Sequence, residues 1–297
     1  MDLASNPALT GVTVTNNGVN GLLVDGGTLP ANGFWDDPDI TYELSNSVTV
    51  PAGKTLTVAP GQVVKGRALW GEDIIVQGRL LAEGTPAAPI VFTSDRDDTA
   101  GGDTNNDGSA SAPARGNWGT IQFAATSTGS MLDHAEVRYG GAGAAAVWAS
   151  GCSVAIKNSV IRHSSTHGVC AQNNAQMQLT SNVIVQNSGA GVRAESGASV
   201  AAVNNTIDGN NPGVHADAAA AVLTNNLISN NTTAGVRASG GAVVTAAYNG
   251  VFNPSAANGN YYGLASQTGQ NGNLSADPLY SDRINLDFTL QGGSPAR

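Results

Sequence analysis

The residues with the clearest potential for chemistry lie in an acidic segment of the 297-residue chain. Asp103, Asn105 and Asp107, followed by Gly108, have the D-x-N-x-D-G spacing of a calcium-binding loop. Oxygens at alternate positions converge on one point, and neighbouring carboxylates repel each other unless a cation lies among them. The candidate ligands of a structural Ca²⁺ are Asp95, Asp97, Asp98, Asp103, Asn105 and Asp107.

This acidic segment departs from an EF-hand in one respect. The twelfth position, which an EF-hand fills with Glu, is Ala114. The missing ligands would then come from the upstream aspartates and from backbone carbonyls. The alternative is a solvated acidic loop inserted between regular elements.

A second set of charged residues recurs at intervals of 22 positions: Arg193, Glu195, His215, Asp217 and Arg237. On one face, Arg or His would act as the base that abstracts a proton beside a uronate carboxylate, while a neighbouring Arg neutralises that carboxylate. A carboxylate pair would instead serve hydrolysis. The alternative is cross-strand ion pairing on a solvated sheet, which contributes little per pair.

The other reactive side chains form no recognised motif. His134, His163 and His167 belong to no H-E-x-x-H motif, and the chain contains no G-x-S-x-G, phosphate-loop or dinucleotide fingerprint. Cys152 and Cys170 are 18 residues apart, close to one repeat, so the sequence leaves open whether they are bridged.

The elements that must position these residues are internal repeats. An isoleucine column (Ile161, Ile184, Ile207 and Ile228, preceded by Val137) has spacings of 24, 23, 23 and 21. A valine column and an alanine column accompany it: Val147, Val169, Val192, Val214 and Val236, then Ala149, Ala171, Ala194, Ala216 and Ala238.

These columns predict an all-β fold, a right-handed parallel β-helix of roughly ten coils. Each strand is too short to bury a face alone, so the coils must stack and place like residues on one another. Alternation with period 2 directs the Ile, Val and Ala side chains inward. The residues between the valines and alanines then point outward, in the row Trp148, Cys170, Arg193, His215 and Arg237.

Asparagines recur at the corners of the predicted coils. Ser159, Asn182, Asn205 and Asn226 align, and each amide both donates and accepts hydrogen bonds. We expect a ladder along the axis. Each glycine before a column valine (Gly168, Gly191, Gly213 and Gly235) fits a corner with close backbone approach or positive φ.

Four regions of one continuous solenoid are expected along the chain. Residues 1–30 are read as the last coil of a preceding array, because 12–27 align with 227–241. Residues 31–115 form opening coils with the acidic loop, 116–253 the regular coils, and 254–297 the closing segment.

Several segments resemble bacterial secreted right-handed parallel β-helix repeat proteins of the pectate-lyase-like superfamily. They are VTVPAGKTLTVAPGQVVKGR (48–67), GNWGTIQF (116–123), YNGVFN (248–253), GNLSADPLY (272–280) and DFTLQGGSPAR (287–297). The resemblance implies the β-helix fold and a longer parent chain. It does not imply one activity, because the family includes polysaccharide lyases, epimerases, adhesins and surface stalks.

Composition narrows the function classes. A net charge of −9 argues against nucleic acid as a partner, and no apolar run is long enough for membrane insertion. The favoured hypothesis is a non-enzymatic extracellular or cell-surface module, of stalk or adhesin type. Its expected partners are neighbouring modules of the parent chain and, if the module contacts glycans, a polysaccharide. The alternatives are a lyase or epimerase acting on an anionic polysaccharide, and non-catalytic carbohydrate binding.

Overall fold

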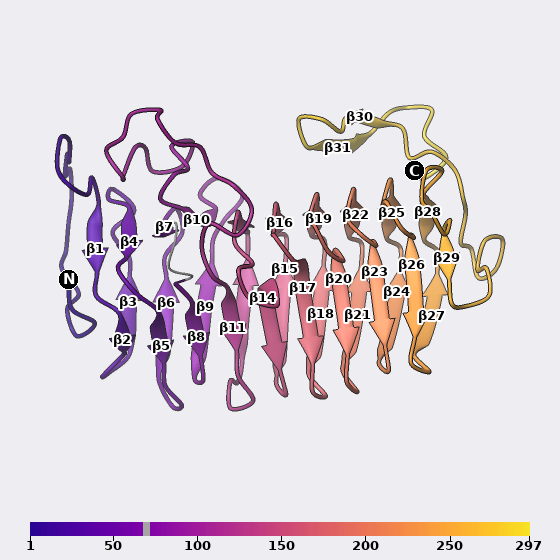
Figure 1. The fold of residues 1–297 in the computed structure, drawn as a ribbon, viewed down its shortest axis with the longest axis horizontal. Coiled ribbons are helices and arrows are strands. Elements are labelled where there is room, and N and C mark those ends of the chain that lie inside the picture. The colour runs from indigo at the N-terminus through magenta and orange to yellow at the C-terminus, as the bar shows by residue number, and fades with distance from the viewer. Residues whose placement is uncertain (68–71) are drawn as a thin grey trace.

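The computed structural model describes residues 1–67 and 72–297, which wind into a solenoid of three parallel sheets (Figure 1). Each coil contributes one short strand to each sheet in turn. The described residues contain no helix. The predicted all-β stack of about ten coils is therefore confirmed, since two of the sheets have ten strands.

The strands of the three sheets follow in stacking order. Sheet A contains β1 (Leu22–Val24), β4 (Tyr42–Leu44), β7 (Val63–Gly66), β10 (Ile90–Ser94), β13 (Ala135–Arg138), β16 (Val160–Arg162), β19 (Val183–Val185), β22 (Thr206–Asp208), β25 (Leu227–Ser229) and β28 (Gly250–Phe252). Sheet B contains β2 (Gly27–Thr28), β5 (Val48–Val50), β8 (Ile74–Val76), β11 (Ile121–Phe123), β14 (Ala145–Ser150), β17 (His167–Gln172), β20 (Val192–Glu195), β23 (Val214–Asp217), β26 (Val236–Ser239) and β29 (Tyr261–Tyr262). Sheet C contains β3 (Gly33–Trp35), β6 (Thr55–Val58), β9 (Arg79–Glu83), β12 (Ser130–Asp133), β15 (Ser153–Lys157), β18 (Gln176–Thr180), β21 (Ser199–Val203), β24 (Ala220–Thr224) and β27 (Val243–Ala247).

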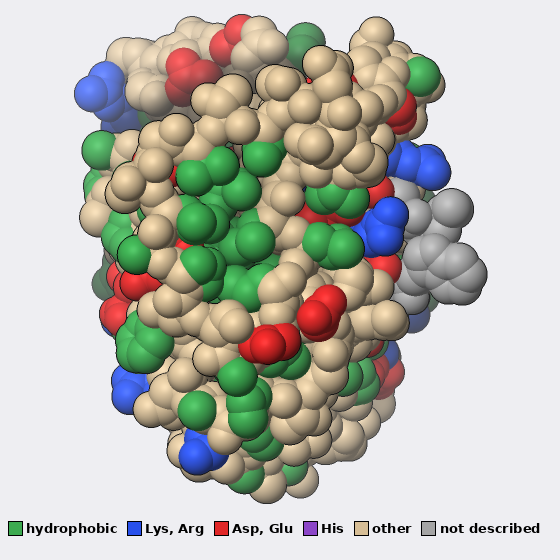
Figure 2. Space-filling model, turned by 90° about the vertical axis from the view of Figure 1, so that its left-hand side faces the viewer, with side chains coloured by type: hydrophobic (Ala, Val, Ile, Leu, Met, Phe, Trp, Pro, Cys, Tyr) green, Lys and Arg blue, Asp and Glu red, His purple; other side chains and the backbone are tan. Residues whose placement is uncertain are grey.

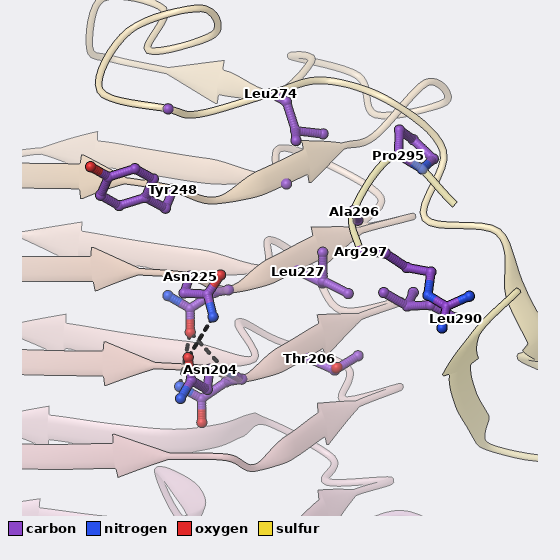
Figure 3. Close-up of a pocket in the computed structure, with 14 residues that line it drawn as sticks. Asn204, Thr206, Asn225, Leu227, Tyr248, Leu274, Leu290, Pro295, Ala296 and Arg297 are labelled. Carbon is purple, nitrogen blue, oxygen red and sulfur yellow. Dashed lines mark hydrogen bonds between the residues drawn. The ribbon is translucent and has the colours of Figure 1, made fainter. Parts of the chain in front are cut away.

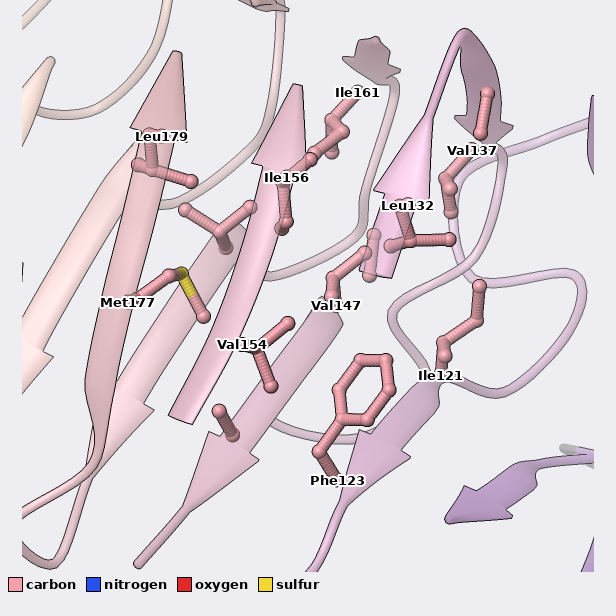
Figure 4. Packing of buried hydrophobic residues seen from close by; sticks show 14 of the residues in the cluster. Ile121, Phe123, Leu132, Val137, Val147, Val154, Ile156, Ile161, Met177 and Leu179 are labelled. Carbon is pink, nitrogen blue, oxygen red and sulfur yellow. The ribbon is translucent and has the colours of Figure 1, made fainter. Parts of the chain in front are cut away.

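The repeat columns of the sequence are the strand registers of the solenoid. Ile161 pairs with Ile184 in sheet A, and Val169 pairs with Val192 in sheet B. The inward side chains fill one continuous core between the sheets, shown in part in Figure 4. Because each coil covers the apolar surface of the next, the strands of the interior coils bury their inner faces although they are only three to six residues long.

The predicted asparagine ladder is present at the corner between sheets C and A. The Asn205 side chain accepts hydrogen bonds from the backbone N–H and the side-chain amide of Asn182, and donates to Asn226 at 2.9 Å. A second ladder, which the sequence analysis did not identify, follows the strands of sheet A: Asn187, Asn210, Asn231, Asn253 and Asn260.

The corner glycines of the regular coils are explained by close approach. A Cβ atom added to Gly191 would lie 2.7 Å from the amide nitrogen of Asn210 and 2.9 Å from the carbonyl oxygen of Gly213. Gly168, Gly213 and Gly235 are equally crowded, and none of the four has a positive φ. Of the two reasons offered for these glycines, close approach is therefore correct.

The first coil differs from the repeat alignment. The alignment places Leu22–Val24 in the strand column of Val236, in sheet B. Instead β1 pairs with β4 in sheet A, and residues before it run irregularly across the end of the solenoid. Figure 2 shows an apolar area, in green, at this end of the solenoid. The apolar side chains of the segment that pack on the core are Met1, Leu3, Leu9, Val12 and Val14.

Two segments cover parts of the outer face of sheet A (Figure 1). The loop between β10 and β11 carries the acidic residues and is attached by Asp97, which forms an ion pair with Arg138. The C-terminal hairpin of β30 (Tyr280–Asp282) and β31 (Asp287–Leu290) is attached through Arg283, whose Nε lies 2.5 Å from Asp208. No helix in the described part of the chain is long and apolar enough to cross a membrane.

Candidate functional site

The charged residues predicted to share a face do meet on the outer surface of sheet B. Parallel pairing places Arg193 beside His215 and His215 beside Arg237. The same register places Glu195 beside Asp217 and Asp217 beside Ser239. The row continues to Cys170 and Trp148 on one side and to Tyr262 on the other.

Arg193 is the centre of this face. Its Nε donates to Glu195 Oε2 at 2.9 Å, and its Nη2 donates to Asp217 Oδ2 at 3.0 Å. Its Nη1 donates to the Nδ1 atom of His215. The guanidinium is thus bonded to three neighbours and its side chain is only 16% exposed.

The His215 side chain is buried among neighbouring side chains, although its position on the strand faces away from the core. It is 6% exposed, and burial, reinforced by the charges of Arg193 and Arg237, lowers its pKa to about 4. The ring is therefore neutral at pH 7. With Nδ1 accepting from Arg193, Nε2 donates to Ser239 Oγ at 2.9 Å, and Ser239 donates to Asp217 Oδ1 at 2.9 Å.

Arg237 is bonded differently from Arg193. Its guanidinium lies 5.6 Å from the centroid of the Tyr262 ring, a cation–π contact. Its Nε is buried and has no hydrogen-bond partner among the described residues. On this face, Arg193 therefore donates to three acceptors, whereas the buried Nε of Arg237 has no acceptor among the described residues.

The acidic residues upstream of the predicted calcium loop have separate environments. Asp97 is 1% exposed and lies 2.6 Å from Arg138 Nε. Burial acts to raise the pKa of Asp97, but hydrogen bonds from Thr93 and Thr99, with the charge of Arg138, outweigh it and lower that pKa. Asp95 is also buried. Asp98 has a raised pKa because of burial and the nearby charge of Asp103.

The carboxylates of the D-x-N-x-D-G segment accept hydrogen bonds from groups of the same segment. Asp103 accepts from the amides of Asp107 and Gly108, at 3.1 and 2.8 Å. Asp107 accepts from the Asn105 amide at 3.0 Å and from Ser111. Within residues 1–67 and 72–297, no group of three or more His, Cys, Asp or Glu side chains is arranged to hold a metal ion. The calcium site stays a prediction.

An ion-pair network on sheet A was not identified from the sequence. Glu136 Oε1 accepts from Arg138 at 3.1 Å and from Arg162 at 2.6 Å, so Asp97, Arg138, Glu136 and Arg162 form one chain of contacts across β13 and β16. The available signal was the spacing of 24 between Arg138 and Arg162, which equals that of Val137 and Ile161. The repeat columns used for the prediction contained only apolar residues, so they did not include this arginine pair.

The two cysteines are free. Cys152 and Cys170 are both buried, and burial raises the pKa of each thiol, to about 12 for Cys170. A thiol that stays protonated and covered is a poor nucleophile. The bridge that the sequence left open is not formed.

A hollow of about 420 Å³ separates the C-terminal residues from sheet A (Figure 3). Thr206 and Leu227 lie on the sheet side, and Pro295 to Arg297 lie across from them. The Asn225 amide donates to Asn204 at 2.7 Å along the corner row. None of the predicted site residues lines this hollow.

Stacked parallel coils with a shared core and asparagine ladders define the class of parallel β-helix proteins. The family described as "Right handed beta helix region" matches residues 126–277, just over half of the chain, and the chain belongs to this family. The description "Pectate-lyase like beta helix domain" matches residues 27–152. The right-handed fold that the columns and the resemblance predict is confirmed.

Two solved structures are similar to the chain at low identity. The Dettilon tailspike protein shares 12% identity at a TM-score of 0.40, covering 80% of this chain and 49% of that one. The mannuronan C-5 epimerase AlgE4 A-module of Azotobacter vinelandii shares 12% identity at a TM-score of 0.31, covering 86% of this chain and 90% of that one. The chain thus spans about half the length of the tailspike. No curated protein sequence matches it.

Proposed function

We propose that the chain is a non-enzymatic β-helix module of a larger bacterial extracellular or surface protein, of the stalk or adhesin type. The observation that carries the proposal is the closed hydrogen-bond circuit on sheet B. Arg193 donates to His215, His215 to Ser239, and Ser239 to Asp217, which also accepts from Arg193.

This circuit is better suited to joining coils than to catalysis. A base must reach a substrate proton, and an electrostatic clamp needs donors aimed at the substrate. The donors of Arg193 and both nitrogens of His215 are already aimed at neighbouring strands. Freeing them would leave charges unpaired on a partly buried surface, which is costly.

The apolar end of the solenoid supports neighbouring modules as partners. Met1, Leu3, Leu9, Val12 and Val14 stay partly exposed there over the first coil (Figure 2). A further coil or module stacked on this end would cover them, as each coil covers the next within the solenoid.

A lyase or epimerase acting on an anionic glycan is the second candidate. The observation that favours it is a neutral imidazole, His215, between two arginines. A neutral imidazole accepts a proton, and the positive charge of Arg237 on the neighbouring strand would attract a substrate carboxylate.

A product assay distinguishes the two candidates. Pectate, alginate, hyaluronan and neutral glycans would be incubated with the protein in D₂O. Unsaturated-uronate absorbance, reducing ends and deuterium incorporation into uronates would be followed. We expect no product and no exchange. Turnover that disappears in His215→Ala and Arg193→Ala, and persists in the variant Arg79→Gln at an exposed position of sheet C, would overturn the non-enzymatic proposal.

A further inference from the structure

The outer face of sheet C carries no charged side chain over its last four strands, β18, β21, β24 and β27. The outward positions of these strands, which alternate with the core residues, hold only Gln, Thr, Ser, Ala and Val. The outward positions of earlier strands of the same sheet include Arg79, Glu83, Asp133 and Lys157. One half of this face therefore differs in charge from the other half, in a chain whose net charge is −9.

Two valines form an exposed apolar centre on the uncharged half of the face. Val222 is 48% exposed and Val243 is 66% exposed, and they are among the few large apolar side chains that are exposed in the described part of the chain. Val243 pairs with Ala220 and Val222 pairs with Thr245, so the two valines are diagonal neighbours on adjacent strands. Neither side chain reaches the core, so the fold itself does not require a valine at these positions. Exposed apolar side chains that cluster in this way are typical of a protein contact surface.

The face has the shape of a sheet that packs on another sheet. The pairing of β18 with β21, of β21 with β24 and of β24 with β27 continues through five residues without a register shift. Ala201 pairs with Val222, and Ala220 lies two residues before it, so each side of this valine has a shallow depression. Sheets that pack face to face lie about 10 Å apart and interdigitate their side chains. A second copy of the chain would present the same projections and depressions, as a two-fold contact requires.

The distribution of charge favours a second copy as the occupant. Two molecules with a net charge of −9 repel each other, and burying a charge without a partner is costly. A contact between two uncharged faces buries no charge and leaves the acidic side chains in solvent. The acidic loop and the C-terminal hairpin both lie over sheet A, so neither obstructs sheet C (Figure 1).

We propose that two copies of this chain associate side by side through the outer faces of β18, β21, β24 and β27. Four strands about 4.8 Å apart, each five residues long at about 3.3 Å per residue, give a face of roughly 20 Å by 16 Å. Two such faces bury less than the roughly 1,200 Å² at which stable complexes begin. The dimer is therefore weak and reversible, and it forms where copies are concentrated. This association goes beyond the proposed module function and does not depend on whether sheet B is catalytic.

Sedimentation equilibrium from about 10 μM to about 1 mM, with a reductant present, tests the proposal. Val222→Lys places a charge at the centre of the face. Ile284→Lys is the matched control, because this exposed aliphatic side chain lies in the turn between β30 and β31 and the charge change is the same. Val12→Lys places the charge at the N-terminal end of the solenoid instead. Melting curves report whether each variant folds.

We expect the average mass to rise from that of one chain toward that of two, and to rise further with salt, which screens the repulsion between the copies. Val222→Lys should weaken the association tenfold or more, because the contact would bury an unpaired ammonium group. Ile284→Lys and Val12→Lys should leave the association unchanged.

Three results would each overturn the proposal. They are no association up to about 1 mM, unchanged association in Val222→Lys, and an association that Val12→Lys abolishes, which would place the contact at the end of the solenoid. If Val222→Lys does not fold, Val243→Lys on the neighbouring strand decides by the same criterion.

Discussion

Glu43 on β4 is a carboxyl group buried under the acidic loop with an incomplete set of partners. It is 1% exposed, Arg67 lies 3.3 Å from its Oε1, and Oε2 has no hydrogen-bond partner in the described part of the chain. Burial, followed by the charge of Asp95, raises its pKa from 4.5 to about 7. Between pH 4.5 and about 7, Glu43 is therefore mostly protonated in the folded protein and mostly ionised in the unfolded chain.

The sign and size of the effect on stability follow from this difference. An acid with a raised pKa contributes its full stability below about pH 4.5, and that contribution is lost as the pH rises to about 7. At about 1.4 kcal/mol per pKa unit, ionised Glu43 costs the folded state about 3 kcal/mol at pH 8. Glu43→Gln has the same shape and never ionises. It should raise the free energy of unfolding by about 3 kcal/mol at pH 8 and by less than about 1 kcal/mol at pH 5.

Urea unfolding at the two pH values measures this difference. The control is Glu83→Gln, an exposed glutamate at the end of β9, which should change the free energy of unfolding by less than about 0.5 kcal/mol at both. An equal effect of Glu43→Gln at pH 5 and pH 8, or no stabilisation at pH 8, would refute the reasoning.

Three further predictions concern the ladders, the loop and calcium. Asn205→Ala removes the acceptor of the buried Asn182 N–H, so it should lower the free energy of urea unfolding by about 3 kcal/mol, whereas Asn225→Gly at an exposed position should lower it by less than about 1 kcal/mol. Similar losses in the two variants would contradict the ladder's role. Arg138→Met leaves Asp97 buried and unpaired, so it should cost about 3–5 kcal/mol and speed proteolysis within the acidic loop, and unchanged proteolysis would argue against the anchor. If the D-x-N-x-D-G spacing binds calcium, Ca²⁺ raises the melting temperature, chelator reverses it and Asp103→Asn abolishes it; a melting temperature indifferent to Ca²⁺ would remove this site.

The regular coils were predictable from the sequence. Columns such as Ile161–Ile184 and Val169–Val192 repeat because each residue packs on its counterpart one coil away. The same register correctly placed Arg193, His215 and Arg237 in one row. It did not show that His215 is covered, because burial of an outward side chain depends on how the neighbouring side chains lie over it.

The non-repeating parts were decided by tertiary structure. Leu22–Val24 joined sheet A because partner strands, rather than a weak repeat, determine the register of an end coil. The acidic loop lies where Asp97 meets Arg138, 41 residues away in sequence. The sequence by itself determined the stack and its rows, since nearest-neighbour packing imposes a period on the residues. Only the tertiary structure decided which charges are buried, since contacts across an insertion leave no period in the sequence.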